Sequence, residues 1–237
     1  MTAALPVRHP IGDTEGMAPA FADRRDAGRR LAANLADLGD GPPDDVVVLG
    51  LPRGGVPVAA EVAAALGAPL DVLVVGKVGV PGHEELALAA VADDGSVAVN
   101  PGVIAGTGMT ADEVDELARV HAAALRRRAA ELRGDRDPVA VDGRTVVVVD
   151  DGMATGATMR VALEVVRRRR PRAVVAAVPV ASAEAAAGVA TVADRIVCVL
   201  IPPGFRAVGP WYADFTQVSD DEVRALLPSA VQSADDA

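Results

Sequence analysis

Lysine, cysteine and aromatic residues are all scarce in this chain. Lys77 is the one lysine among 23 basic residues, and aromatic residues make up 2% of the sequence. The single cysteine, Cys198, lies within the apolar run IVCVLI, so an intramolecular disulfide is excluded and a buried thiol is expected. No apolar run approaches the ~20 residues of a membrane-spanning helix, and the N-terminus lacks an apolar signal core. We therefore expect a cytoplasmic protein without a membrane partner.

Small aliphatic residues and negative charge are abundant instead. The 237 residues are 51% hydrophobic, mostly Ala and Val, which is enough for one large aliphatic core. The net charge of −10 repels nucleic-acid phosphates, so we expect no nucleic-acid partner. The arginine runs at 126–128 and 167–170 are interpreted as solvated helix surfaces or helix ends.

Strand-like and helical patterns alternate along the chain, which predicts βαβ units and a parallel sheet. The region 77–107 is Gly-rich and expected to be irregular, with short strands at 88–91 and 96–99 and a hairpin turn at Asp94–Gly95. Thr110 and Glu113 form a capping box that starts a long helix. The other strands are expected at 46–49, 71–75, 144–149, 173–178 and 196–201, and the helices at 19–38, 58–66, 110–132, 158–169, 183–189 and 220–227.

The segment RTVVVVDDGMATGATM, residues 144–159, is the most informative in the chain. Its four valines indicate a buried parallel strand, and ligands bind at the carboxyl ends of such strands. Asp150 and Asp151 follow the valines and can accept hydrogen bonds from vicinal hydroxyls or approach a divalent cation. The turn at 154–158 offers backbone N–H groups, two hydroxyls and a helix N-terminus to an anion. This pattern predicts a phosphate cradle beside a diol-binding acid pair, as a ribose 5-phosphate requires.

This segment resembles the 5-phosphoribosyl-1-pyrophosphate (PRPP) motif of the type I phosphoribosyltransferases. That motif is a hydrophobic strand, two acidic residues, two variable residues, a small residue and Thr-Gly-x-Thr, and the match runs from Val146 to Thr158 without a gap. The resemblance implies an α/β fold with a central parallel sheet of about five strands flanked by helices. It also implies a flexible loop and a small hood formed by 19–40 and 202–228. The expected PRPP-binding residues of the motif are Asp150, Asp151, Gly152, Met153, Ala154, Thr155, Gly156, Ala157 and Thr158.

A second loop, LPRGG, follows the strand expected at 46–49. Arg53 offers a permanent charge and five donors, while Gly54 and Gly55 allow the backbone to approach a ligand closely. An ordinary Gly-rich turn with a surface arginine is the alternative. The resemblance implies that this loop binds the pyrophosphate of PRPP and contains a non-proline cis peptide near Arg53–Gly54.

Lys77 directly follows the strand expected at 71–75, so we expect it at the same sheet edge as the two loops. Its compact ammonium group suits pyrophosphate oxygens, and the resemblance implies a basic residue at this point. Residues 80–86 are expected to form a mobile loop that closes over the substrate. His83 and Glu84 are candidates for acid–base catalysis, although ordinary solvated side chains are the alternative.

Most of the aromatic residues cluster in GFRAVGPWYADF, residues 204–215. The clustering favours a surface that stacks a planar ring, and the resemblance implies that an aromatic residue in the hood stacks on the nucleobase. Phe205, Trp211 and Tyr212 are the expected base-binding residues. A local mini-core that anchors the C-terminal helix is the alternative.

The resemblance implies transfer of 5-phosphoribosyl from PRPP to a nucleobase or related nitrogen nucleophile, with release of pyrophosphate. It further implies a Mg²⁺ cofactor near Asp150, Asp151 and Asp214, and it makes a homodimer plausible. Ala154 stands where relatives specific for hypoxanthine or guanine carry an acid, so those acceptors are disfavoured. The residues expected to carry catalysis are Lys77, Arg53, Asp150, Asp151, His83 and Glu84.

Two alternatives to a transferase stay open from the sequence. One is a PRPP- or nucleotide-sensing regulator that keeps the fold without transfer, and the other is an unrelated α/β phosphosugar binder. We expect one domain over 19–228, between disordered tails at 1–18 and 229–237.

Overall fold

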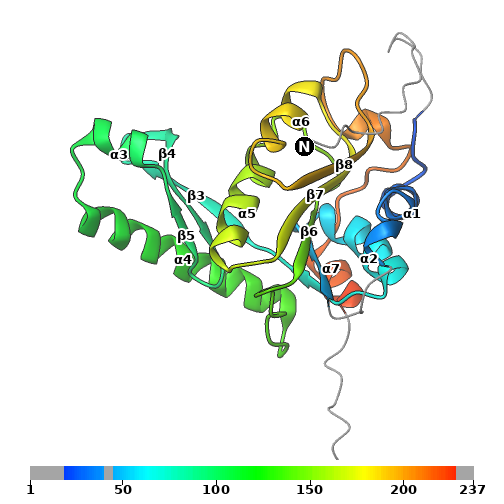
Figure 1. Cartoon of the computed structure of the whole chain (residues 1–237), viewed down its shortest axis with the longest axis horizontal. Helices are drawn as coiled ribbons and strands as arrows, with labels where there is room; N and C mark the ends of the chain where they lie inside the picture. Colours follow the sequence, from blue (N-terminus) through cyan, green and yellow to red (C-terminus); the bar gives the residue numbers. More distant parts are fainter. Residues whose placement is uncertain (1–18, 40–44, 228–237) are drawn as a thin grey trace, which may run out of the picture.

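A central sheet of five parallel strands forms the body of the molecule, as expected (Figure 1). The computed structural model describes residues 19–39 and 45–227, so the expected tails at 1–18 and 229–237 lie outside the described residues. The strand order is β2-β1-β6-β7-β8, which places β1 beside β6 at the centre. The strands are β1 (Val46–Gly50), β2 (Leu70–Val72), β6 (Thr145–Val149), β7 (Ala173–Val180) and β8 (Arg195–Leu200).

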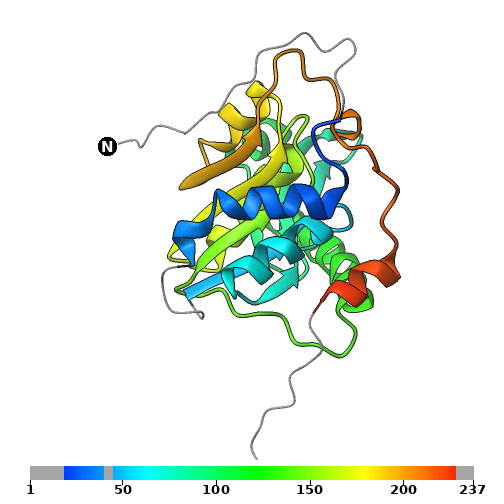
Figure 2. The ribbon, with the colours of Figure 1, turned by 90° about the vertical axis from the view of Figure 1, so that its right-hand side faces the viewer.

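Helices cover both faces of this sheet. Along β6, Val146 and Val148 belong to one hydrophobic core, whereas Val147 and Val149 belong to the other. Both faces of the strand are therefore buried, which is why its sequence is continuously apolar. Figure 2 shows α1 and α2 side by side over one face. The helices are α1 (Arg24–Ala33) and α2 (Gly55–Leu66) on that face, α5 (Ala157–Arg168) and α6 (Ala183–Val189) on the other, and α7 (Asp220–Leu226) against α2.

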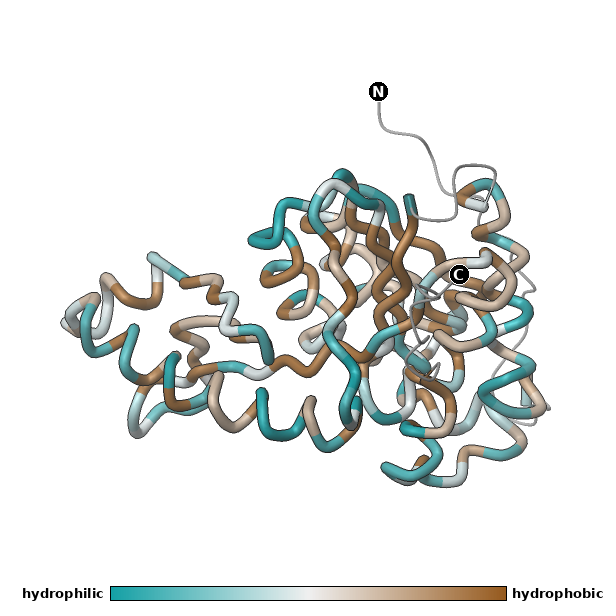
Figure 3. Tube along the Cα trace, turned by 90° about the horizontal axis from the view of Figure 1, so that it is seen from below, coloured by the Kyte–Doolittle hydropathy of each residue, from teal (hydrophilic) through white to brown (hydrophobic). Residues whose placement is uncertain are grey.

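A second, antiparallel sheet projects from this body together with two helices (Figure 1 and Figure 3). We call these elements the side lobe: β3 (Val75–Val80), β4 (His83–Ala92), β5 (Val97–Val99), α3 (Pro101–Thr107) and α4 (Ala111–Arg133). Ala118 and Ala122 of α4 pack on Val78 and Val91 of the sheet. The Thr110–Glu113 capping box begins α4, as predicted. No helix among the described residues has the length and apolar character needed to cross a membrane.

The side lobe corrects two expectations from the sequence. Residues 77–107 are not irregular: β4 and β5 contain most of the strands expected at 88–91 and 96–99, and antiparallel pairing with β3 extends β4 over ten residues that include a single β-branched residue, Val91. The chain also leaves the central sheet after Val72, so Lys77 lies on β3 of the side lobe and not at the edge of the central sheet. The hairpin turn at Asp94–Gly95 is confirmed, with Gly95 at φ 88° and Ser96 bonded to Asp94.

The first helix begins at Arg24, not at residue 19. Asp23 caps it by accepting a hydrogen bond from the Asp26 N–H at 2.7 Å. The residues before it pair with a distant segment instead: the Phe21 N–H donates to the Trp211 carbonyl, and the Ala213 N–H donates to the Phe21 carbonyl. The two segments expected to form a hood are thus adjacent in space.

Candidate functional site

Asp150 and Asp151 lie at the carboxyl end of β6, in the middle of the central sheet. The Asp151 N–H donates to Asp150 Oδ1 at 2.9 Å, which orients the first carboxylate. Asp151 Oδ2 accepts a hydrogen bond from Arg24 Nε at 2.9 Å, and Tyr212 Oη donates to the Asp151 carbonyl at 2.6 Å. The acid pair is therefore held by residues from both ends of the chain.

Burial dominates the electrostatics of this pair. It raises the pKa of Asp150 well above its usual range, and the negative charge of Asp151 raises it further. Burial also raises the pKa of Asp151, while the hydrogen bond and positive charge of Arg24 oppose that rise. Low-dielectric surroundings disfavour the charged form of both acids. A ligand that donates hydrogen bonds to the two carboxylates would therefore stabilise their ionised form.

The turn after the acid pair has the form of an anion cradle. Gly156 adopts a left-handed φ of 70° immediately before α5, where a Cβ would contact Val189 at 3.1 Å. Ala154, Thr155 and Thr158 are exposed at this turn, and the Thr155 hydroxyl oxygen accepts a hydrogen bond from the Ala157 N–H at 3.3 Å. Ser182 Oγ holds the turn by donating to the Ala154 carbonyl at 2.8 Å. The turn therefore presents hydroxyls and backbone donors at a helix N-terminus, which favours phosphate.

The loop between β1 and α2 packs directly against the acid pair. A Cβ on Gly54 would overlap Asp151 Oδ2, and one on Gly55 would lie 2.6 Å from the Val149 carbonyl oxygen. The cis peptide expected near Arg53–Gly54 lies one residue earlier, between Pro52 and Arg53. Because β1 and β6 are neighbours in the sheet, both loops meet at the same edge, as the sequence predicted.

Comparisons with known proteins agree with this geometry. The model of the phosphoribosyl transferase domain family matches residues 21–205. The chain belongs to this family. Its central sheet has the type I phosphoribosyltransferase fold. The matched residues end at 205, before Trp211 and Tyr212.

Two relatives are similar over most of this chain. A Mycobacterium tuberculosis protein, provisionally named a phosphoribosyl transferase, is 50% identical over 210 residues, covering 89% of this chain and 47% of the relative. The chain thus spans about half the length of the curated relatives it matches. The crystal structure of TT1426 from Thermus thermophilus is 47% identical, with a TM-score of 0.78 and coverage of 87% of this chain and 97% of that one.

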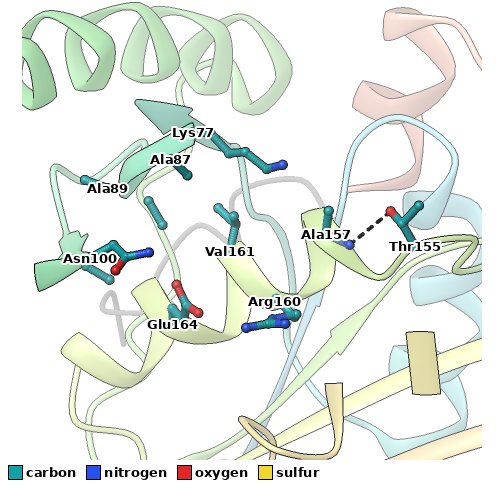
Figure 4. A pocket seen from close by; sticks show the side chains of 11 residues that line it. Lys77, Ala87, Ala89, Asn100, Thr155, Ala157, Arg160, Val161 and Glu164 are labelled. Carbon is teal, nitrogen blue, oxygen red and sulfur yellow. Dashed lines mark hydrogen bonds between the residues drawn. The ribbon is translucent and has the colours of Figure 1, made fainter. Parts of the chain in front are cut away.

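The remaining predicted site residues are Arg53, Lys77, His83 and Glu84, and their neighbours differ from one another. Arg53 approaches Asp220 of α7, with 3.8 Å between Nη1 and Oδ1. Lys77 lines a cavity together with Thr155 and Ala157 of the cradle (Figure 4). His83 and Glu84 are exposed at the start of β4, which replaces the expected loop by a β-hairpin. The pyrophosphate role of Lys77 and the acid–base roles of His83 and Glu84 stay predictions.

The aromatic cluster packs as a mini-core. Trp211 is 8% exposed and Tyr212 is 4% exposed, and both pack with Phe21. Phe205 lies parallel to Trp211, with 6.3 Å between the ring centroids. This burial favours the mini-core alternative, and the base-binding roles of Phe205, Trp211 and Tyr212 stay predictions. Phe215 is 37% exposed, although its ring contacts the Tyr212 ring, with 5.0 Å between the centroids, and the Arg24 guanidinium.

The metal roles of Asp150, Asp151 and Asp214 stay predictions. Among residues 19–39 and 45–227, no three His, Cys, Asp or Glu side chains lie close enough to hold a metal ion together. Asp214 instead accepts hydrogen bonds from the backbone and hydroxyl of Thr216. Asp150 and Asp151 still offer hard oxygen ligands, which suits an ion that is shared with substrate phosphates.

Two arginines near the site, Arg24 and Arg160, were not predicted from the sequence. Arg24 pairs with Asp151, stacks on Phe215 with 3.9 Å between Cζ and the ring centroid, and donates to the Thr216 carbonyl at 2.8 Å. Arg160 faces the cavity that Lys77 lines. Only Arg160 carried a local signal, because it lies on the first turn of the helix that begins at the cradle.

Proposed function

We propose that this chain transfers the 5-phosphoribosyl group of PRPP to a nitrogen of a nucleobase or related acceptor and releases pyrophosphate. One observation carries this proposal: the half-buried acid pair lies between the Gly54–Gly55 loop and the cradle at 154–158. This order matches the order of groups in PRPP, which has a pyrophosphate, a ribose diol and a 5-phosphate.

Each group of the substrate then has a matching set of residues. Asp150 and Asp151 accept hydrogen bonds from the ribose hydroxyls, and the backbone and hydroxyls at 155–158 bind the 5-phosphate. Arg53 and the loop of Gly54 and Gly55 bind the pyrophosphate. These preorganised groups stabilise the departing pyrophosphate and the oxocarbenium-like ribose without reorganising during the reaction.

A magnesium ion fits the donors at this site. Mg²⁺ keeps several waters and binds through one or two carboxylates plus substrate phosphates, and Asp150 and Asp151 supply such carboxylates. When bound, the ion would neutralise the charge of the pyrophosphate. Arg24 would at the same time keep Asp151 ionised, because its Nε lies 2.9 Å from that carboxylate.

The acceptor is proposed to be a planar nitrogen base other than a 6-oxopurine. Ala154 brings no carboxylate near the N7 position of such a purine. The aromatic rings left for stacking are Phe205 and the exposed Phe215. A homodimer, which the family resemblance made plausible, also stays a proposal.

Calorimetric titration of PRPP with and without Mg²⁺, beside ribose 5-phosphate and pyrophosphate, tests this function. We expect Mg-dependent binding of PRPP that is tighter than the binding of either fragment. A screen of nucleobases for pyrophosphate release then identifies the acceptor. Absence of PRPP binding under both conditions would contradict the proposal. Binding without release for any acceptor would instead support a PRPP-sensing protein.

A further inference from the structure

A cavity of about 280 Å³ lies between α5 and the side lobe, directly beside the cradle (Figure 4). Helix α5 contributes Ala157, Arg160 and Glu164, which share one face of the helix. The side lobe contributes Lys77 from β3 and Asn100 after β5. The cavity is continuous with the cradle, because Thr155 lines both.

Two exposed positive charges, Lys77 and Arg160, line this cavity together with one carboxylate, Glu164. Figure 4 shows the Lys77 side chain reaching from β3 toward the N-terminus of α5, and Arg160 extending from the first turn of α5. Within the described part of the chain, neither side chain makes a hydrogen bond or an ion pair, whereas most arginines there are paired. Two cations without a hydrogen-bond or ion-pair partner therefore line one cavity against a single carboxylate, in a chain with net charge −10, and this excess of positive charge indicates an anion site.

We propose that this cavity is a second anion subsite, which binds the outer phosphate of a 5-diphosphate ligand whose inner phosphate occupies the cradle. The ligand class is a nucleoside 5-diphosphate. This inference rests on the proposed function, because the inner phosphate uses the same cradle as the 5-phosphate of PRPP. A nucleoside diphosphate would therefore compete with PRPP.

The dimensions of the cavity support one additional phosphate. With a helical rise of about 1.5 Å per residue, Arg160 lies about 4.5 Å along the axis from Ala157, within reach of a second phosphate. Glu164 lies about 10 Å from Ala157, so a third phosphate would approach its carboxylate.

Calorimetric titration of nucleoside mono-, di- and triphosphates tests this subsite. The titrations use Mg-free buffer, and both adenosine and uridine series are included because the acceptor base is not identified. We expect the diphosphate to bind at least tenfold more tightly than the monophosphate in one series or both, and the triphosphate to gain nothing further. The diphosphate should also raise the apparent dissociation constant of PRPP.

Arg160→Gln is the decisive variant, and Arg168→Gln is its matched control. Arg168 lies on the same helix and is exposed, but it does not line the cavity. In Arg160→Gln the diphosphate should bind no more tightly than the monophosphate, while monophosphate and PRPP affinities stay at wild-type values. Arg168→Gln should keep the wild-type preference.

Two results would overturn the subsite while leaving the proposed function intact. The first is PRPP binding by a wild-type protein that shows no preference for diphosphates in either series. The second is a diphosphate preference that survives in Arg160→Gln. If neither PRPP nor any monophosphate binds, the proposed function and the subsite both fail.

Discussion

At the scale of single residues, the site imposes an electrostatic cost on the fold. Burial raises the pKa of Asp150, and the neighbouring charge of Asp151 adds to this. For an acid with a raised folded-state pKa, the associated stability is complete below the unfolded value of about 3.9 and is lost as pH rises through the folded-state value. The ionised form, which we propose binds the ribose hydroxyls, is therefore the form that folding disfavours.

Asp150→Asn should expose this conflict. The amide keeps an oxygen for the Asp151 N–H but cannot ionise, so the variant should be more stable than wild type at pH 8, with a gap that narrows toward pH 4. Losing a charged acceptor costs about 1.5–3 kcal/mol, so PRPP affinity should fall about 10- to 100-fold. Urea unfolding at pH 4.5, 6 and 8 and calorimetry check both effects. A variant that is less stable at pH 8 would contradict the electrostatic argument.

Gly55→Ala tests the close approach of the two loops. Its Cβ would lie 2.6 Å from the Val149 carbonyl oxygen and 2.9 Å from Asp150 Cα, so the loop must move away from the acid pair. Overpacking of this kind costs about 1–3 kcal/mol and should weaken PRPP binding together with stability. Gly106→Ala is the control, because nothing lies within 4 Å of its Cβ. Equal melting temperatures and PRPP affinities for the two variants would refute the crowding.

At the scale of elements, Arg24 connects three segments that are far apart in the sequence. It begins α1, pairs with Asp151 after β6 and stacks on Phe215 of the aromatic segment. Its side chain is 11% exposed, so water screens these contacts only weakly. The aromatic segment thus supports the acid pair through Arg24 and through the Tyr212 hydroxyl.

Arg24→Gln should make PRPP binding pH-dependent. Burial already raises the pKa of Asp151, and without the guanidinium that faces it beside Asp150 the pKa rises further. The ionised acid accepts the ribose hydroxyls, so affinity should fall about tenfold at pH 6 and recover as pH rises. Calorimetry from pH 6 to 9 measures this, and unchanged emission from Trp211, the single tryptophan, shows that the aromatic segment stays folded.

Arg25→Gln is the control for Arg24→Gln. Arg25 is the next residue, its side chain is 58% exposed, and it pairs only with Glu61 at 3.4 Å. Its loss should leave PRPP affinity unchanged at every pH. If PRPP affinity depended on pH equally in both variants, or did not depend on pH in Arg24→Gln, Arg24 would not be the residue that keeps Asp151 ionised.

At the scale of the whole molecule, a buried ionic cluster joins the side lobe to the central sheet. Arg133 of α4 bonds Asp71 of β2 at 2.7 Å and Asp93 after β4 at 2.5 Å. Arg169 at the end of α5 adds an ion pair with Asp94 at 2.7 Å. The same cluster therefore sets the position of the side lobe relative to α5, and with it the walls of the cavity that Lys77 and Arg160 line.

Arg133→Met should destabilise the protein by about 3–5 kcal/mol, because it leaves two buried carboxylates without their partner. Arg119→Met is the control: Arg119 is 73% exposed and its partner is Glu116, so solvent screening should leave the stability of this variant close to that of wild type. Urea unfolding of both variants measures the difference. A loss below about 1 kcal/mol for Arg133→Met would mean that the cluster does not hold the lobe.

Local patterns accounted for much of the fold. The valine runs predicted the central strands, and the capping box at Thr110 predicted the start of α4, because both signals arise within a few neighbouring residues. The meeting of the LPRGG loop with the acid pair was also predictable, since neighbouring parallel strands end at one edge. The strands of the side lobe were underestimated, because pairing between strands outweighs their weak β propensity.

The sequence by itself determined the phosphoribosyltransferase family, the parallel sheet and the position of the acid pair, because each depends on contiguous residues or on the rule for parallel strands. Tertiary structure alone decided three further points: the pairing of Arg24 with Asp151, the burial of Trp211 and Tyr212, and the facing positions of Lys77 and Arg160. These contacts join residues that are far apart in the chain. Arg24 and Asp151, for example, are separated by 127 positions in the sequence. Only the packing of the folded chain brings such residues together, so no local pattern predicts these contacts.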